Sequence, residues 1–167
     1  VPTPIDSDHQ PDLTLVKKSC EEIAKHLSKG TLVIIESTIF PGTCEEVVKP
    51  ILDTAKVPYD LAHCPERIDP GNTKYNVSNL PRVIGAVSGL DTAQKFYESI
   101  IDAKITPLSS IKAAESVKIM ENTFRDVNIA FVNEMAKSFK MLGIDITEVI
   151  KGASTKPFGF LAHFPGC

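Results

Sequence analysis

The spacing of hydrophobic residues along the first 108 residues alternates between two patterns. At 12–29 it follows intervals of three and four, which predicts a helix with one buried face: Leu13, Val16, Cys20, Ile23, Ala24 and Leu27. Short apolar runs predict four buried strands, at 31–36, 59–64, 82–87 and 104–108. Two further helices are predicted, at 43–55 and 91–102, and each opens on a capping box. This alternation predicts an α/β fold, part of a Rossmann-like, doubly wound parallel sheet.

The pattern changes after residue 108. From 108 to 142 there is neither Gly nor Pro, which predicts a single helix over 110–142, roughly 50 Å long at ~1.5 Å per residue. One apolar stripe runs along it: Val117, Met120, Phe124, Val127, Phe131, Met135, Phe139 and Leu142. So long a helix is predicted to bridge domains or subunits, with its stripe buried against a second copy or the C-terminal segment. A short helix at 146–153 follows in a small all-α region.

The amino-acid composition excludes some classes of binding partner. The 167 residues are 43% hydrophobic and 23% charged, with a net charge of −3, which is typical of a soluble globular protein of one or two domains. We expect no nucleic-acid partner, because there is no basic excess, and no membrane span, because the longest clean apolar run is only 32–35. The four Cys and four His show no metal-ligand spacing, so we expect no metal site, no disulfides and a cytoplasmic location.

Polar residues stand where three strands end. In open parallel sheets, ligands bind beyond the carboxyl ends of the strands. Thr3 follows a strand whose earlier part is expected to be missing, Ser37-Thr38 follows the 31–36 strand, and Glu66-Arg67 follows the 59–64 strand. A Ser-Thr pair is usually turn chemistry, and Glu66 with Arg67 could be a surface ion pair. Their convergence on one crevice favours a ligand site.

Lys118 and Asn122 lie one helical turn apart, nearly opposite the apolar stripe. Lys and Asn side chains at this spacing commonly face solvent and bind no ligand. If the first turns of the helix pack beside the strand ends, both side chains face a cleft shared with Thr38 and Glu66, which is our prediction. There a lysine supplies charge to a developing alkoxide, and an asparagine amide donates a hydrogen bond. Near the C-terminus, residues 158, 160 and 164 are all Phe, and they form either a local core or the lining for a flat ligand.

Several motifs occur in order and at the intervals of a known family: Val1-Pro2-Thr3-Pro4, Glu36-Ser37-Thr38 with Pro41-Gly42-Thr43, Cys64-Pro65-Glu66-Arg67 with Pro70-Gly71, and Ala114-Glu115-x-x-Lys118-x-x-x-Asn122 with Asn133-Glu134. With them the sequence resembles the UDP-glucose/GDP-mannose 6-dehydrogenase family. The tail at 156–160, with Pro165-Gly166, is most similar to the branch that oxidises UDP-N-acetylhexosamines. The resemblance covers essentially the whole sequence, but only the middle of a family member.

The resemblance implies a four-electron oxidation at C6 of a nucleotide sugar, from alcohol through aldehyde to acid, with two NAD. The implied substrate is a UDP-sugar. The implied domains are the C-terminal part of an NAD-binding Rossmann-like domain at 1–108 and the start of a central helical dimerisation and substrate domain at 109–167. The helix at 110–142 would form the core of a homodimer.

The family's roles carry over position by position. The implied cofactor-binding residues are Val1, Pro2, Thr3, Ser37, Thr38 and Glu66. The implied catalytic residues are Thr38, Glu66, Lys118 and Asn122, the last two stabilising the oxyanion and holding the water. The implied substrate-binding residues are Glu66, Arg67, Lys118, Asn122, Lys156, Phe158 and Gly159.

Two departures from the family pattern matter. Pro70 stands where UDP-glucose members have a second glutamate, so no proton-transfer role is assigned there. The GxGxxG fingerprint and the catalytic cysteine lie outside this sequence, and Cys167 is expected to be a bystander. We therefore expect a fragment that does not turn over alone. Other interpretations stay open: a UDP-glucose or GDP-mannose 6-dehydrogenase, or a non-catalytic module for nucleotide-sugar binding or dimerisation.

Overall fold

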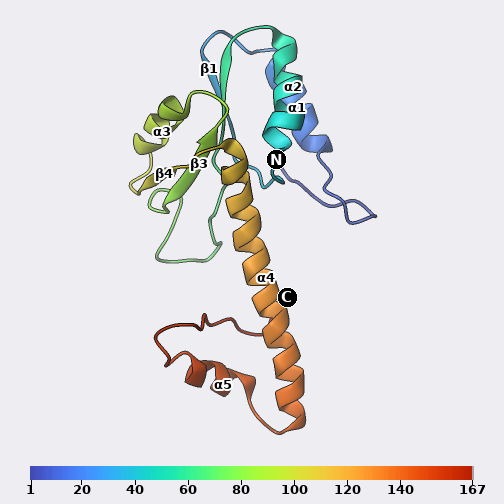
Figure 1. Ribbon diagram of the computed structural model, residues 1–167, viewed down its shortest axis with the longest axis vertical. Coiled ribbons are helices and arrows are strands. Elements are labelled where there is room, and N and C mark those ends of the chain that lie inside the picture. Colours follow the sequence, from blue (N-terminus) through green and yellow to red (C-terminus); the bar gives the residue numbers. More distant parts are fainter. Residues whose placement is uncertain (167) are drawn as a thin grey trace. The chain divides into compact units, whose positions relative to one another are not determined.

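The computed structural model describes residues 1–166 and divides into two compact units, one at Val1–Ile119 and one that begins at Met120. The first unit holds α1 (Thr14–Ala24), β1 (Thr31–Ile35), the π-helical turn η1 (Cys44–Val48), α2 (Lys49–Leu52), the 3₁₀ turn η2 (Asp53–Ala55), β2 (Tyr59–His63), β3 (Arg82–Ala86), α3 (Leu90–Glu98) and β4 (Ile105–Pro107). α4 (Ile111–Met141) begins in the first unit and ends in the second, which also holds α5 (Ile146–Ala153) (Figure 1). Every helix and strand predicted between residues 12 and 153 is present, although the helix at 43–55 consists of η1, α2 and η2, and residues 1–4 form no strand.

The four strands form one sheet in the order β1-β2-β3-β4. β1 and β2 are parallel, and so are β3 and β4, but β2 and β3 run antiparallel, with Ala62 opposite Ala86 and His63 opposite Gly85. A parallel pair needs a crossover connection, usually a helix, and the described loop 64–81 contains none. The α/β fold class is confirmed, while the expectation of a wholly parallel sheet is wrong at this pair.

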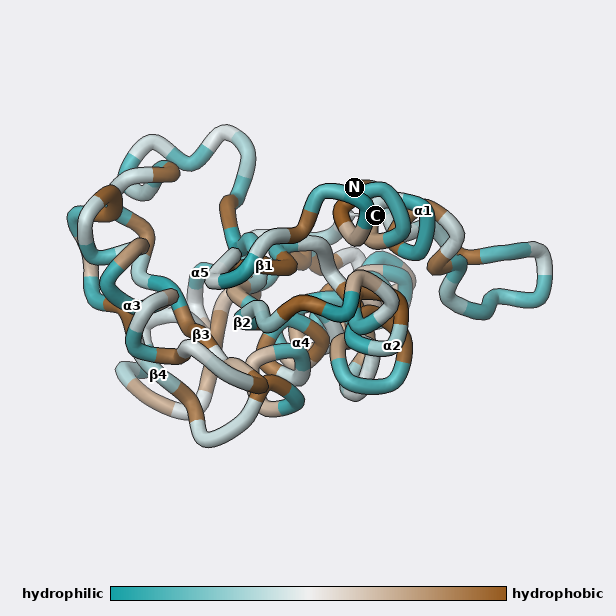
Figure 2. Tube along the Cα trace, turned by 90° about the horizontal axis from the view of Figure 1, so that it is seen from above, coloured by the Kyte–Doolittle hydropathy of each residue, from teal (hydrophilic) through white to brown (hydrophobic). Residues whose placement is uncertain are grey.

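Hydrophobic residues cover both faces of the sheet. α1 and the η1–α2 segment pack on one face, in a core that includes Val33 and Leu61. α3 packs on the other face, with Ala62 and Ile84. Leu61 and Ala62 thus belong to opposite cores, as successive residues of a strand do. Figure 1 shows α3 across the sheet from α1 and α2, and Figure 2 shows hydrophobic residues along the strands.

The start of α3 differs from the expectation. The predicted capping box at Asp91 is wrong, because α3 begins at Leu90, directly after Gly89, and no side chain caps it. Gly89 has a φ of 72°, in the left-handed region that favours glycine. A Cβ at this position would also lie 2.3 Å from Asp60 Cγ. A glycine turn, rather than a side-chain cap, therefore starts this helix.

α4 is continuous over Ile111–Met141, which confirms the single long helix. At ~1.5 Å per residue it is roughly 46 Å long. Part of its apolar stripe is uncovered in a single chain: in the second unit Met120 is 73% exposed, and Val127 and Phe131 are each 59% exposed. None of the described helices is both long and apolar enough to cross a lipid bilayer.

His63 is fully buried on β2. Its two ring nitrogens make no well-aligned hydrogen bond with any described residue. Burial lowers the pKa of His63 from 6.5 to about 4. Between these two pH values the ring is neutral in the folded protein, while the same ring in the unfolded chain takes up a proton.

Acid should therefore destabilise the protein through His63. As the pH falls from 6.5 toward 4, proton uptake by the unfolded chain lowers the free energy of unfolding by roughly 3 kcal/mol, whereas above pH 6.5 the ring has no such effect. In urea titrations of the full-length protein, His63→Leu should flatten this pH dependence. His26→Gln is the control, since the His26 side chain is 77% exposed, and it should follow the wild type. An equally steep pH dependence in His63→Leu would contradict this account.

Candidate active site

The end of β1 and the first residues of the chain lie together. Ser37 Oγ donates a hydrogen bond to the carbonyl oxygen of Val1 at 2.9 Å. Pro2 is exposed beside this contact. Thr3 and Thr38 line one small cavity of about 160 Å³, together with Ile119 of α4. The structure therefore brings Thr3, which follows no strand, close to Thr38 after β1, with Ile119 of α4 beside them.

Glu66 and Arg67 open the loop after β2. The backbone N–H of Glu66 donates to the carbonyl oxygen of Glu36 at 3.1 Å, which holds the ends of β1 and β2 side by side. Glu66 Oε1 accepts hydrogen bonds from the backbone N–H groups of Arg67 and Ile68, at 2.7 and 2.9 Å. Arg67 Nη1 donates to the carbonyl oxygen of Pro81 at 3.2 Å. The Glu66 side chain is thus folded over its own loop, with Oε1 held by two backbone donors.

Arg82, the first residue of β3, lies at the same edge of the sheet. Its side chain is only 4% exposed, and its Nη1 lies 3.0 Å from Glu66 Oε2 and 3.6 Å from Glu36 Oε1. Tyr97 of α3 completes the group, because its hydroxyl donates to Glu36 Oε1 at 2.6 Å and its ring centre lies 5.5 Å from the guanidinium carbon. We call Glu36, Glu66, Arg82 and Tyr97 the Arg82 cluster.

The Arg82 cluster keeps its members in defined charge states. Burial is the largest influence on the pKa of Arg82 and would lower it, but Glu66 and Cys64 beside the guanidinium together outweigh burial and raise that pKa. Burial raises the pKa of Tyr97, and the hydrogen bond to Glu36 acts in the same direction. The cluster therefore contains a permanent cation and a neutral hydroxyl donor. Arg82 was not predicted as a site residue, because a lone arginine before an apolar run carries no signal without the strand register.

Glu115 of α4 is fully buried and binds the loop that follows β1. Its carboxylate accepts hydrogen bonds from the backbone N–H of Gly42 at 2.6 Å and of Cys44 at 2.8 Å. The predicted capping box at Thr43 is therefore wrong, since the Thr43 hydroxyl donates to the carbonyl oxygen of Phe40 instead. A negative charge at a helix start is favourable, and here a different helix supplies it.

Glu115, Lys118 and Asn122 share one face of α4, at spacings of three and four. Because Glu115 binds the loop after β1, the helix face that carries Lys118 is turned toward that loop, and Lys118 is half-buried. Asn122 belongs to the second unit, where Arg125 Nη2 donates to its Oδ1 at 3.3 Å. No hydrogen bond or ion pair among the described residues joins Lys118 to the strand-end side chains, so the shared cleft stays a prediction.

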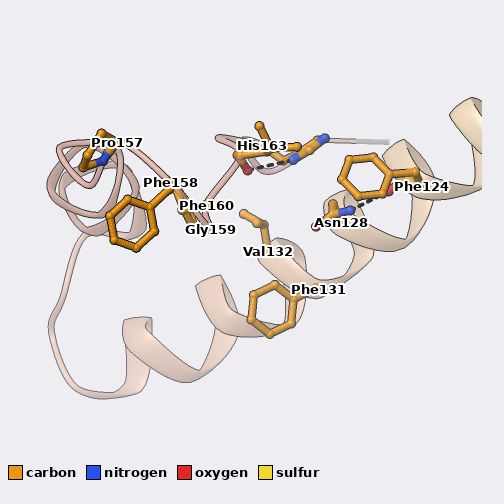
Figure 3. Close-up of a pocket in the computed structure, with 10 residues that line it drawn as sticks. Phe124, Asn128, Phe131, Val132, Pro157, Phe158, Gly159, Phe160 and His163 are labelled. Carbon is orange, nitrogen blue, oxygen red and sulfur yellow. Dashed lines mark hydrogen bonds between the residues drawn. The ribbon is translucent and has the colours of Figure 1, made fainter.

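The second unit contains an aromatic cavity of about 520 Å³ (Figure 3). Its walls come from α4 and the C-terminal loop: Phe124, Asn128, Phe131, Val132, Pro157, Phe158, Gly159, Phe160, Leu161 and His163. Phe158 and Phe160 thus line a cavity, whereas Phe164 does not. Lys156 Nζ lies 5.0 Å from the ring centre of Phe158, in cation–π distance. A flat, partly polar ligand suits such walls.

The end of the described chain is tied to α4. Asn133 Nδ2 donates to the carbonyl oxygen of Gly166 at 2.7 Å, and Asn133 Oδ1 accepts from Gly166 N–H at 3.1 Å. Cys167, the expected bystander, lies outside the described residues. Within residues 1–166, no group of three His, Cys, Asp or Glu side chains is placed to hold a metal ion.

Two family models match the chain. Residues 1–102 match the NAD binding domain of the UDP-glucose/GDP-mannose dehydrogenase family, and residues 112–167 match the central domain of the same family.

Relatives and solved structures agree with this match. The chain is 42% identical over 173 residues to a UDP-N-acetyl-D-glucosamine 6-dehydrogenase of Pseudomonas aeruginosa, covering 99% of this chain and 41% of that protein. It is 43% identical over 162 residues to a UDP-N-acetyl-D-mannosamine dehydrogenase of Methanocaldococcus jannaschii, covering 94% of this chain and 37% of that protein. The structure of a UDP-D-ManNAc dehydrogenase from Pyrococcus horikoshii superposes with a TM-score of 0.89 at 38% identity, covering 98% of this chain and 40% of that one. The chain thus spans about two fifths of the length of such relatives.

Proposed function

The chain belongs to the UDP-glucose/GDP-mannose dehydrogenase family, and on that basis we propose that it is part of an oxidoreductase that converts C6 of a UDP-N-acetylhexosamine to the uronic acid in two NAD-dependent steps. The observation that carries the proposal is the match of nearly the whole chain to relatives named for these sugars. Identity to the N-acetylglucosamine and N-acetylmannosamine proteins is nearly equal, so the proposal names the substrate class and not the epimer.

We assign the dinucleotide to the strand ends of the first unit. Thr3 and Thr38 face one cavity, and Ser37 is fixed on the backbone of Val1. In this proposal the strand ends would hold NAD, which would supply the hydride acceptor for each oxidation of C6. Glu66, whose Oε1 accepts two backbone hydrogen bonds after β2, would lie near the nicotinamide and the reacting carbon.

Two of the four proposed catalytic residues come from α4, and the others are Thr38 and Glu66. Lys118 supplies positive charge, and Asn122 an amide donor, to the oxygen that becomes negative as C6 is oxidised. Asn122 also holds the water that enters in the second step. The turn of the Lys118 face toward the loop after β1, fixed by Glu115, supports this placement.

The second unit contributes the nucleotide end of the substrate site. In the second unit, Lys156, Phe158 and Gly159 meet the nucleotide. The aromatic walls of the 520 Å³ cavity support this assignment, because planar bases bind well against such walls. Arg67, which belongs to the first unit, acts on the sugar diphosphate from the loop after β2. The division of roles falls near residue 109, with the NAD-binding part at 1–108 and the substrate and dimerisation part at 109–167.

We also propose that the whole protein is a cytoplasmic enzyme of polysaccharide biosynthesis.

The proposed partner for the apolar stripe of α4 is a second copy of the protein. Phe131 lies in the middle of the stripe and is 59% exposed, which is unfavourable for a solitary chain. We expect the full-length wild type to scatter light as a dimer and Phe131→Asp to shift it toward a monomer. Lys140→Ala, on the same helix, is the control and should stay dimeric. A monodisperse wild-type monomer would rule the arrangement out.

The activity is tested with the full-length protein, NAD and a panel of nucleotide sugars. The panel contains UDP-N-acetylglucosamine, UDP-N-acetylmannosamine, UDP-N-acetylgalactosamine, UDP-glucose and GDP-mannose. We expect two NADH for each N-acetylhexosamine consumed, with the uronic acid identified by mass spectrometry. Preference for UDP-glucose or GDP-mannose would move the substrate assignment to another branch. Binding without any NADH would favour the non-catalytic module.

A further inference from the structure

The buried side chain of Arg82 donates few well-aligned hydrogen bonds. Its side chain is 4% exposed, and neither Nε nor Nη1 makes a well-aligned hydrogen bond with a described residue. The compensation is instead electrostatic, from Glu66 at 3.0 Å and Glu36 at 3.6 Å. Both carboxylates are partly exposed, Glu66 at 38% and Glu36 at 48%, and ion pairs that reach solvent contribute little net stability. A role for Arg82 beyond stability is therefore the stronger explanation of its position.

The antiparallel pairing of β2 and β3 explains how Arg82 reaches Glu66. His63 is opposite Gly85, so the same register continued beyond β2 places residue 82 opposite residue 66. In a parallel pair the first residue of β3 would lie at the other edge of the sheet, about 16 Å away for a five-residue strand. The reversed direction of β3 thus brings a cation to the carboxyl ends of β1 and β2, where the family's ligands are expected.

The two oxygens of Glu66 have separate partners. Oε1 accepts from two backbone N–H groups of its own loop, and Oε2 pairs with Arg82. The backbone contacts alone fix one oxygen and leave the carboxylate free to rotate about it. The Arg82 guanidinium supplies a second contact, to the other oxygen. Arg82 itself is held by its strand and by the ring of Tyr97.

We propose that Arg82 is a positioning residue for Glu66, fixing the orientation of its carboxylate at the ends of β1 and β2. The inference rests on the proposed function, in which Glu66 lies near the nicotinamide and the reacting carbon. In this inference Arg82, with a side chain only 4% exposed, acts on the reaction through Glu66 and not by its own contact with cofactor or substrate. Its removal therefore misplaces the carboxylate without removing it.

A double-mutant cycle on kcat in the full-length protein tests this role. Arg82→Met should lower kcat about 100-fold, the scale expected from a misplaced group, with KM for the sugar largely unchanged. In a Glu66→Gln background the same change should have no further effect, because the residue through which Arg82 acts is already lost. Arg82→Lys keeps the charge and should restore part of the activity.

Further variants distinguish a positioning role of Arg82 from an effect on folding and from a failure of the proposed function. Tyr97→Phe disturbs the same cluster but leaves the Arg82–Glu66 pair, so it should lower the melting temperature without a matching loss of kcat. If Arg82→Met does not fold, the cycle is run with Arg82→Lys. Equal kcat losses from the Arg82 change in the wild-type and Glu66→Gln backgrounds would overturn the inference while the proposed function stands. A folded wild type that oxidises none of the panel overturns the proposed function, and this inference with it.

Discussion

Changing Lys118 to methionine in the full-length protein should lower kcat for UDP-N-acetylhexosamine oxidation by about 10²–10³-fold, the usual effect of removing one group that stabilises a developing oxyanion. The methionine keeps most of the side-chain length, so the half-buried position stays filled. Because the lost interaction belongs to the transition state, kcat and kcat/KM should fall together. Steady-state rates of NADH formation measure both.

Lys112→Met is the matched control. Lys112 lies on the same helix and pairs with Glu45 and Glu46 at 3.3 Å, but its side chain is 51% exposed. Exposed pairs of this kind are worth little, so its loss should leave kcat unchanged. An active Lys118→Met protein, with rates close to those of the control, would remove Lys118 from the proposed mechanism.

The second large expected effect is a loss in the free energy of unfolding when Glu115 is replaced. Glu115→Ala leaves the backbone N–H groups of Gly42 and Cys44 buried without acceptors, each at a cost of about 1–3 kcal/mol. Glu115→Gln should cost less, because its amide oxygen still accepts one of the two bonds. Urea unfolding of the full-length protein measures both losses.

An exposed acid on the same helix provides the comparison. Glu134 pairs with Lys137 at 2.6 Å, but its side chain is 71% exposed. Glu134→Ala should therefore change the free energy of unfolding by less than about 1 kcal/mol. If Glu115→Ala is no more destabilising than Glu134→Ala, the buried carboxylate does not hold α4 to the loop after β1.

Local patterns predicted the elements because each pattern depends on one segment only. The apolar run that contains Val33 is enough to predict a buried strand, whatever lies beside it. The break-free stretch that contains Phe124 is likewise enough to predict one long helix. The strand ends at Thr38 and Glu66 follow from those boundaries. Their convergence follows from the way strands of a doubly wound sheet end.

The features that sequence reasoning missed depend on contacts between distant segments. Arg82 reaches Glu66 only because β3 is reversed, and no local pattern distinguishes a parallel from an antiparallel neighbour. Glu115 caps a helix that starts far earlier in the sequence, so the Thr43 capping box matched a local rule that a distant carboxylate overrode. The motif around Glu115 marked the residue, but its role needed the structure.

The sharing of α4 between the two units has a consequence for the order of folding. A helix forms its first turn at a high cost in entropy, and each later turn adds far more easily. The first turn of α4 is fixed in the first unit, where Ile111 and Ala114 are buried in its core. Among the described residues of the second unit, only Val132 and Ile150 are buried hydrophobics. We therefore expect the sheet to nucleate α4 and the second unit to extend it, so that folding proceeds from the sheet along the helix.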